Sequence, residues 1–478
     1  MGKILVFGTG QFYNNNKKKL ERYLENDIIV AFIDNRAGEI GSFENKSVYS
    51  PAEIHSLSYD KILLMSVHDR EMKEQLISLG VSEDYIVFFW RYICEKSHGK
   101  IWLRVAKFPS HGKRVLIISY ALNYGGGTLA AVYAAMSLYA LGYDVCIATQ
   151  DADEHLAQQI LSKGIHVLIC PAIPCLEKEE LYWMMQFDMV IVNVFQMIRV
   201  ACEVSKYKPI LWWIHESSNK FSDIYPRYRY WFAEYDNVHW MRNLNIYAVS
   251  EVAKRNFEEY YPEMVTGILP YGIPDEATHS QLYTVSEPRE KCIFAVIGVV
   301  SKLKAQDIFL NAAKKLMEKY AGQAEFWLVG SCGSSPYVKE IQQFVKDFPA
   351  AKSLGKMPRK ELGKLYRNID VVVCASLEET MSMTIIESMM HGKVCITTNA
   401  TGIADYIKDG ENGFVCEAGD AEALCEKMVY LLNHKEQCRR LGENARKTYE
   451  KFFSMGEFGK RLEQTLLETE QAYAKRHF

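Results

Sequence analysis

The chain has 478 residues, of which 49% are hydrophobic and 24% are charged, with a formal net charge of −3. This composition is typical of a globular protein, and the nearly balanced charge excludes a general attraction to nucleic acid or to an anionic membrane. The length predicts about three domains. The twelve cysteines contain no C-x-x-C pair and no apolar run is long enough to span a bilayer, so we expect a cytoplasmic protein in a reducing compartment.

The first domain is expected over residues 1–98. An apolar strand at 4–7 meets Gly-Thr-Gly at 8–10, which is typical of the pyrophosphate-binding turn of dinucleotide-binding folds, and Asp34 follows the next strand, where it could bind a ribose. The fingerprint needs a small residue three positions after the second glycine, but this residue is Tyr13. We therefore interpret the segment as a Rossmann-like accessory domain that does not use NAD. An NAD-dependent sugar-modifying enzyme is the less favoured alternative.

A linker is expected over residues 99–112, because charges, glycine and proline interrupt the alternation of strands and helices there. Basic residues in and beside it surround two aromatic residues: Lys96, Lys100, Arg104, Lys107 and Lys113 around Trp102 and Phe108. This pattern allows a peripheral contact with anionic lipid. A plain solvated linker is the favoured interpretation.

The second domain is expected over residues 113–285, as a further α/β layer. Its first strand precedes three glycines at 125–127 and a helical pattern, and a later apolar strand leads to His215. A lone histidine beside two tryptophans is more often structural than functional. The aromatic segment 225–240 could stack on an acceptor sugar, touch lipid, or pack as a core helix.

The third domain is expected over residues 286–478, with its last helix returning to the second domain. A buried strand at 370–376 leads into a turn and then a helix over 384–391. Glu379 lies in the loop and Glu387 about one turn into the helix. Carboxylates accept hydrogen bonds from sugar hydroxyls, and a helix start binds phosphate. The spacing predicts a nucleotide-sugar site, although a surface helix with two solvated acids would have the same spacing.

The Glu-x7-Glu spacing, followed by SMMHGKVCITTNATGIADYIKDGENGFV, resembles family 4 of the retaining glycosyltransferases. Further pieces occur in the family's order over residues 114–478: GGG, ILWWIHE, YAVSEVAKRNF, LPYGIPD, FWLVGSCG, SLGKMPRKELGKLYRNIDVVVCAS and YEKFFSMGEFGKRL. The resemblance implies an α/β protein of GT-B architecture, in which two Rossmann-like domains face a cleft. Here a smaller Rossmann-like α/β domain precedes them, similar to domains fused to bacterial polysaccharide enzymes.

The resemblance also implies roles for individual residues. Glu387 would bind the nucleotide ribose, and Glu379 would bind hydroxyls of the donor sugar. Lys304 would contact the diphosphate, and His215 would lie beside the transferred sugar. The other donor-binding residues would be Gly126, Gly127, Gly298, Lys302, Met383 and Thr384. No metal or further cofactor is implied besides the nucleotide-sugar, for which a UDP-sugar is expected, because cations and N–H dipoles can stabilise a departing diphosphate.

Two features stand apart from this pattern. The family usually has an arginine just after the glycine equivalent to Gly298, where this chain has Val299. Lys302 could supply a point charge there but not a bidentate fork. Asp151 and Asp153 form a D-x-D sequence that resembles the metal site of the other glycosyltransferase fold, although a solvated turn is the favoured interpretation.

These observations together predict a retaining hexosyltransferase that moves a hexose or N-acetylhexosamine to a glycan or lipid-linked acceptor, in the synthesis of a surface polysaccharide or glycoconjugate. We expect it in the cytoplasm or at the inner face of the cell membrane. The alternative is a non-catalytic subunit that stabilises a partner transferase. The presence of Glu379, Glu387 and Lys304 argues against that alternative, and Val299 argues for it.

Overall fold

The computed structural model describes residues 2–107, 110–218, 221–222, 241, 244–277 and 290–477. The aromatic segment 225–240 lies outside the described residues. The described chain forms three β-sheets and two compact units. The first unit comprises Met1–Leu103, Thr149–Asp151 and Leu168–Tyr182, and the second comprises Arg104–Ala148, Ala152–Val167 and Trp183–Phe478. Within the described ranges, no helix combines the length and apolarity that a bilayer crossing requires.

The first sheet belongs to the first unit. Its strands are Lys3–Phe7 (β1), Ile28–Ile33 (β2), Ser42–Phe43 (β3), Lys46–Tyr49 (β4), Lys61–Leu64 (β5) and Ile86–Phe88 (β6). The accompanying helices are Gln11–Tyr23 (α1), Ala37–Ile40 (α2), Asp69–Ser78 (α3) and Phe89–Lys96 (α4). The strand order is β3-β4-β2-β1-β5-β6, and the pairs are parallel except β3 with β4. Alternate residues of the central strands enter two separate apolar clusters, as expected for a parallel sheet covered on both faces.

Tyr13 and Asp34 have structural partners in this unit. Tyr13 is 2% exposed, and its ring packs edge-on against Phe32 and Phe43, with centroid distances of 5.3 Å. The Asp34 carboxylate accepts hydrogen bonds from the backbone N–H and the hydroxyl of Thr9, at 3.2 and 2.7 Å. The tyrosine therefore forms part of the core between α1 and the sheet, which supports the interpretation of an accessory domain.

The second sheet has eight strands. They are Trp102–Arg104 (β7), Arg114–Ser119 (β8), Asp144–Thr149 (β9), His166–Ile169 (β10), Met189–Val192 (β11), Ile210–Ile214 (β12), Asn245–Ala248 (β13) and Gly267–Ile268 (β14). Its helices include Gly126–Ala140 (α5), Glu154–Ser162 (α6), Ile198–Val204 (α7) and Glu251–Glu258 (α10). The strand order is β14-β13-β12-β11-β8-β9-β10-β7. The edge strand β7 lies inside the segment that was expected to be a linker. The sequence did not predict this strand, because three residues are too few for a strand pattern to be recognised.

The basic residues around β7 have acidic partners. Four of them form ion pairs: Lys96 with Asp27, Lys100 with Glu25, Arg104 with Glu154, and Lys113 with Glu470. These pairs neutralise much of the positive charge that suggested a lipid contact. Surface ion pairs of this kind contribute little to stability, typically about 0–1 kcal/mol each.

The third sheet has six strands and is parallel throughout. They are Cys292–Ile297 (β15), Ala324–Val329 (β16), Ala351–Gly355 (β17), Val371–Cys374 (β18), Val394–Thr398 (β19) and Phe414–Cys416 (β20). The helices are Gln306–Lys319 (α12), Pro336–Asp347 (α13), Arg359–Tyr366 (α14), Met383–Met390 (α15), Ala421–Asn433 (α16), Lys435–Phe452 (α17) and Met455–His477 (α18). The order is β17-β16-β15-β18-β19-β20. The strand and helix expected around Glu379 are thus present as β18 and α15, and the α/β class is confirmed.

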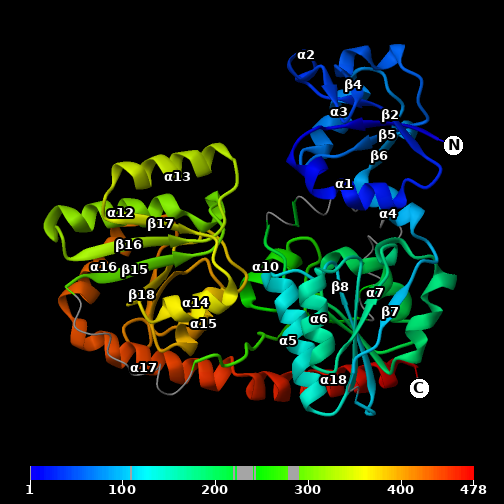
Figure 1. Ribbon diagram of the computed structural model, residues 1–478. Coiled ribbons are helices and arrows are strands. Elements are labelled where there is room, and N and C mark those ends of the chain that lie inside the picture. Colours follow the sequence, from blue (N-terminus) through cyan, green and yellow to red (C-terminus); the bar gives the residue numbers. More distant parts are fainter. Residues whose placement is uncertain are drawn as a thin grey trace. The chain divides into compact units, whose positions relative to one another are not determined.

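Segment 269–277, which follows the second sheet, is held by the last two helices. Figure 1 shows α17 leading into the C-terminal helix α18, which packs against α5 and β12. Where α17 ends, the N–H of Ile273 donates to the carbonyl of Phe453 at 2.9 Å. The guanidinium of Arg446 on α17 binds both carboxylate oxygens of Asp275, at 2.5 and 3.0 Å. These contacts join the segment to α17, and Arg461 of α18 donates to the carbonyl of Pro270 at 3.5 Å.

Candidate active site

Glu379 lies in the loop after β18, and both of its backbone groups form hydrogen bonds. The N–H of Glu379 donates to the carbonyl of Ala400 at 3.2 Å, and the N–H of Gly402 donates to the carbonyl of Glu379 at 2.9 Å. Ser382 then precedes α15 in an extended conformation. Glu379 therefore follows the carboxyl end of a parallel strand, where ligands bind in open α/β sheets.

Lys304 contacts Glu379 directly. Its ammonium forms an ion pair with Oε2 of Glu379, and the two side chains are 29% and 19% exposed. Burial lowers the pKa of Lys304. The lysine ends a single turn of 3-10 helix, Lys302–Lys304, after which Ala305 has left-handed backbone angles, φ +48° and ψ +50°. Such a conformation costs a non-glycine residue about 1 kcal/mol and is typical of functional sites.

Gln306 orders the loop that leads to Lys304. Its buried side chain accepts a hydrogen bond from the N–H of Ser301 at 3.2 Å and donates to the carbonyl of Val299 at 3.0 Å. Gly298 begins the loop, and a Cβ on Gly330 would lie 1.9 Å from its carbonyl oxygen, so glycine at 330 permits the close approach. Val299, at the position of the usual family arginine, is 56% exposed.

Glu387 is buried on the second turn of α15. The residue is 6% exposed, and Oε1 of its carboxylate lies 2.8 Å from Nη2 of Arg359. The hydroxyl of Tyr366 donates to Oε2 at 3.2 Å. Burial raises the pKa of Glu387, while the charge of Arg359 and the hydrogen bond from Tyr366 act in the opposite direction. The carboxylate thus has a separate partner for each oxygen.

Gly127 and His215 lie close to each other, and each follows a strand of the second sheet. Helix α5 begins at Gly126, and a Cβ on Gly127 would lie 3.8 Å from Cβ of His215. The carbonyl of Gly127 accepts a hydrogen bond from Asn193 at 2.8 Å. The His215 ring lies 4.5 Å from that of Trp213, between centroids. A Cβ on Gly126 would meet no described atom within 4 Å.

The loop that carries Glu379 also contacts residues that follow strands of the second sheet. The hydroxyl of Thr380 donates to the carbonyl of His215 at 2.9 Å. The hydroxyl of Ser250 donates to the carbonyl of Thr380, and the hydroxyl of Tyr271 to that of Met381 at 3.1 Å. The second and third sheets therefore meet at the loop between β18 and α15.

The remaining expected residues lie at two helix starts. Met383 and Thr384 form the first turn of α15, where backbone N–H groups lack helical partners. The carbonyl of Thr384 accepts a hydrogen bond from Tyr366 at 3.3 Å. Lys302 is exposed. The structure therefore links Lys304 to Glu379, and Thr384 to Glu387 through Tyr366.

Two charged residues of this region were not singled out from the sequence. Arg359 lies in the string SLGKMPRKELGKLYRNIDVVVCAS and Glu378 immediately precedes Glu379, but nothing in their local spacing connects Arg359 to Glu387 or Glu378 to the second sheet. The carboxylate of Glu378 accepts hydrogen bonds from the N–H of Ser218 at 2.6 Å and from its hydroxyl. The sequence offered one signal, that Glu378 is adjacent to Glu379, and only the packing of the folded chain identifies the partners of the two residues.

The D-x-D sequence has structural partners. Asp153 caps α6 by accepting a hydrogen bond from the N–H of Leu156 at 2.9 Å. Asp151 forms an ion pair with Lys19. Among the described residues, no group of three or more His, Cys, Asp or Glu side chains is arranged to hold a metal ion. The favoured interpretation of this sequence as a structural turn is consistent with these contacts.

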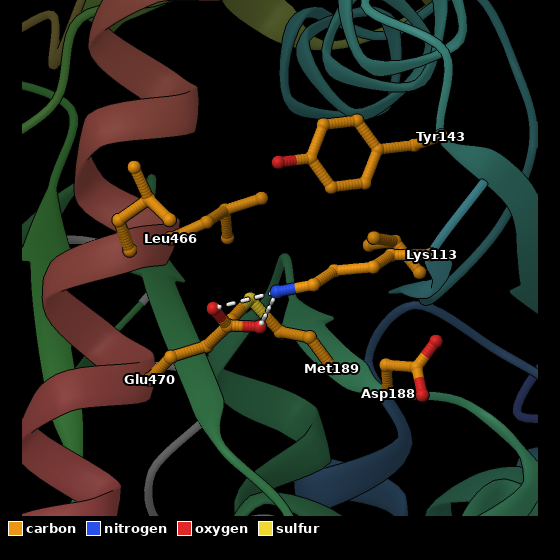
Figure 2. A pocket seen from close by; sticks show the side chains of 8 residues that line it. Lys113, Tyr143, Asp188, Met189, Leu466 and Glu470 are labelled. Atoms are coloured by element: carbon orange, nitrogen blue, oxygen red, sulfur yellow. Dashed lines mark hydrogen bonds and ion pairs between the residues drawn. The ribbon is translucent and has the colours of Figure 1, made fainter.

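A pocket in the second unit lies at the amino-terminal ends of inner strands of the second sheet. It is lined by Lys113, Val115, Tyr143, Asp188, Met189, Leu466, Leu467 and Glu470. Figure 2 shows Lys113 reaching from the sheet to Glu470 on α18, with nitrogen–oxygen distances of 2.9 and 3.0 Å. Lys113, Tyr143 and Asp188 each precede a parallel strand, whereas the expected site residues follow strands. The pocket therefore has no part in the candidate site.

Comparison with known families gives three matches. Residues 284–448 match the family described as glycosyl transferases group 1, and residues 111–240 match glycosyl-transferase family 4. Residues 1–87 match a separate family, C2185-like, N-terminal. The two transferase matches occupy consecutive segments in the expected order. The chain belongs to the family 4 glycosyltransferases. The expected family is thereby confirmed, with a distinct domain before it.

This family 4 member has both sequence relatives and structural neighbours. It is 30% identical to N-acetyl-alpha-D-glucosaminyl L-malate synthase of Bacillus anthracis over 176 residues, which are 36% of this chain and 44% of that protein. It is 27% identical to sulfoquinovosyl transferase SQD2 of Arabidopsis thaliana over 166 residues, or 34% and 31% of the two chains. The matches thus span less than half of these relatives' lengths.

The fold resembles that of a protein whose crystal structures contain UDP and glucose or UDP-glucose. Anabaena HepE, crystallised with UDP and glucose, aligns with a TM-score of 0.61 and 18% identity, covering 75% of this chain and all of HepE. A second crystal structure of HepE contains UDP-glucose, with the same TM-score and 17% identity over 74% of this chain and 99% of HepE. These likenesses concern the fold, and they confirm the expected GT-B class.

Proposed function

We propose that this protein is a retaining hexosyltransferase that transfers a hexose or N-acetylhexosamine from a nucleotide-sugar. The observation that carries the proposal is the arrangement around β18 and α15. There Lys304 meets Glu379 in the loop, and Glu387 lies buried one turn into the helix that follows. A cation, a helix start and two carboxylates are the groups that a diphosphate, a sugar and a ribose need.

We assign the donor's parts to these residues. The Glu387 carboxylate accepts hydrogen bonds from the ribose hydroxyls, and the Glu379 carboxylate accepts them from the donor sugar. Lys304, the N–H groups of Met383 and Thr384, and the exposed Lys302 contact the diphosphate. Gly298, Gly126 and Gly127 leave room for the donor, and His215 lies beside the transferred sugar.

The proposed reaction retains the configuration at the anomeric carbon. The bond between this carbon and the diphosphate oxygen breaks, and a bond to the acceptor oxygen forms on the same face. The acceptor's proton passes to the departing diphosphate. Lys304 and the helix N–H groups stabilise the negative charge that develops on the diphosphate, so this scheme needs no metal. No protein nucleophile takes part.

The donor and acceptor are proposed by class. A UDP-sugar is the expected donor, because HepE was crystallised with UDP and with UDP-glucose in a related fold. A glycan or lipid-linked acceptor fits synthesis of a surface polysaccharide or glycoconjugate. We place the reaction in the cytoplasm or at the inner membrane face. The paired basic residues near β7 leave little charge for a lipid contact there.

The test is a screen of the purified full chain against a panel of nucleotide-sugars, with released nucleoside diphosphate as the readout. Glu387→Ala should weaken nucleoside diphosphate binding, because losing hydrogen bonds to a charged group costs about 1.5–3 kcal/mol. Glu411→Ala, at an exposed position, is the matched control. Unchanged affinity in a folded Glu387→Ala variant would contradict the ribose assignment.

The second candidate is a non-catalytic subunit that stabilises a partner transferase. Val299 favours it, because the family's usual arginine is missing there. This candidate predicts nucleotide binding without turnover on any donor or acceptor. The screen distinguishes the two functions, since the proposed transferase releases nucleoside diphosphate when an acceptor is supplied.

A further inference from the structure

Arg359 and Tyr366 are the first and last residues of α14. Seven positions apart, they lie on the same face of the helix. Their side chains approach different oxygens of Glu387, with Arg359 Nη2 at 2.8 Å from Oε1 and the Tyr366 hydroxyl at 3.2 Å from Oε2. A single helix thus anchors both oxygens of a carboxylate on another helix.

We propose that Arg359 is a positioning residue that keeps the Glu387 carboxylate ionised and correctly oriented for the nucleotide ribose. The inference rests on the proposed function, in which Glu387 binds that ribose. Arg359 acts through Glu387, and its role does not depend on a contact with the nucleotide. It is also separate from the question of the arginine missing at position 299.

The physical reason is the cost of burying an isolated charge. A carboxylate removed from water becomes protonated unless a cation or hydrogen bonds compensate. Burial raises the pKa of Glu387, and the charge of Arg359 is the largest effect that opposes this rise. A protonated carboxyl group gains a donor and loses acceptor capacity. Ribose hydroxyls would then meet a group with the wrong hydrogen-bonding pattern.

The other ionisable groups around Glu387 do not replace Arg359. Glu276 lies 3.6 Å from Nε of Arg359 and raises the pKa of Glu387. Burial raises the pKa of Tyr133 on α5 to about 12, and it also raises the pKa of Tyr271, so both phenols are neutral near pH 7. Burial raises the pKa of Tyr366 as well. Among the side chains that the structure describes, Arg359 is the cation that forms an ion pair with this carboxylate.

The test measures uridine binding to the full chain by calorimetry, between about pH 8 and pH 6, in buffers with different ionisation enthalpies. Uridine carries the ribose but lacks the terminal phosphate of UDP, which would itself take up a proton near pH 6. Wild-type protein should bind with nearly constant affinity and little proton exchange. Arg359→Gln should bind more weakly as the pH falls, by up to about tenfold per pH unit, because Glu387 then takes up a proton. Arg359→Lys should restore a flat pH profile, even with weaker binding, because it restores the charge. Arg367→Gln, beside the end of the same helix, is the matched control.

A double variant shows whether Glu387 is the group that takes up the proton. Arg359→Gln combined with Glu387→Gln should give a flat pH profile, since the titrating group is gone. If Arg359→Gln has the wild-type profile, or if the double variant keeps the pH dependence, the inference is wrong. Should Arg359→Gln fail to fold, Arg359→Met tests the same idea, because it also removes the positive charge beside Glu387 and should show the same loss of binding as the pH falls. Wild-type protein that binds no nucleotide would instead overturn the proposed function.

Discussion

The side-chain amide of Asn256 on α10 donates a hydrogen bond to Oε1 of Glu378 at 2.8 Å, across 122 positions of the chain. The same carboxylate accepts hydrogen bonds from the backbone and hydroxyl of Ser218. Glu378 immediately precedes Glu379, so the residue before the proposed sugar-binding carboxylate binds the part of the unit that holds His215. This contact joins the two halves of the proposed site.

Glu378→Gln should impair turnover more than nucleotide binding. The amide offers one acceptor oxygen instead of two, and a hydrogen bond to a charged group contributes about 1.5–3 kcal/mol. The residue assigned to the ribose and the helix N–H groups assigned to the diphosphate belong to α15, whereas the side chain of Glu378 binds Ser218 and Asn256. We therefore expect a small change in UDP affinity and at least about a tenfold lower kcat. Calorimetry and released UDP measure the two effects. Equal losses in binding and turnover would show that Glu378 supports the fold of the nucleotide site instead.

Lys304→Met should weaken binding of UDP much more than binding of uridine. Lys304 faces Glu379 and is assigned to the diphosphate, so its loss removes a charge-assisted contact worth about 1.5–3 kcal/mol. Lys302→Met should have a smaller effect, because Lys302 is exposed. Competition binding with both ligands measures the difference. A larger loss of UDP binding in Lys302→Met would show that Lys302, and not Lys304, is the main contact of the diphosphate.

His391 should make stability fall in acid. Burial lowers its pKa to about 4, and its ring stacks on that of Tyr366 at 4.6 Å. In the unfolded chain His391 binds a proton near pH 6.5, whereas in the folded chain it stays neutral down to about pH 4. Its contribution to the free energy of unfolding is therefore fully present above pH 6.5 and is lost as the pH falls towards 4. We expect a loss of about 2 kcal/mol by about pH 5. Urea unfolding at several pH values, compared with His391→Asn, measures it. An identical pH dependence in the variant would contradict the assignment.

Turnover should survive chelation. The proposed charge stabilisation uses Lys304 and the helix N–H groups, and Asp153 already caps α6. EDTA should therefore leave the release of nucleoside diphosphate unchanged, and Asp151→Asn should behave like wild type. Loss of activity in EDTA that manganese restores would return the D-x-D sequence to consideration as a metal site.

The sequence by itself determined the α/β class and the loop and helix that carry Glu379 and Glu387. Both depend on short-range patterns. Apolar strands such as VVVC at 371–374, followed by a turn and a helical period, can be recognised because each residue's neighbours along the chain define the element. The strand and helix ends differ from the expectation by only one or two residues, which reflects fraying.

Tertiary structure decided which charges meet. Arg359 reaches Glu387 across 28 positions, and Ser218 reaches Glu378 across 160. It also decided that Tyr13 packs between aromatic residues, and that part of the expected linker forms the edge strand β7. Local periodicity says which face of an element is buried, but it contains no information about which distant side chain lies opposite. That pairing depends on how strands order themselves in a sheet and how helices pack on it, so only the folded chain shows the partner of each carboxylate.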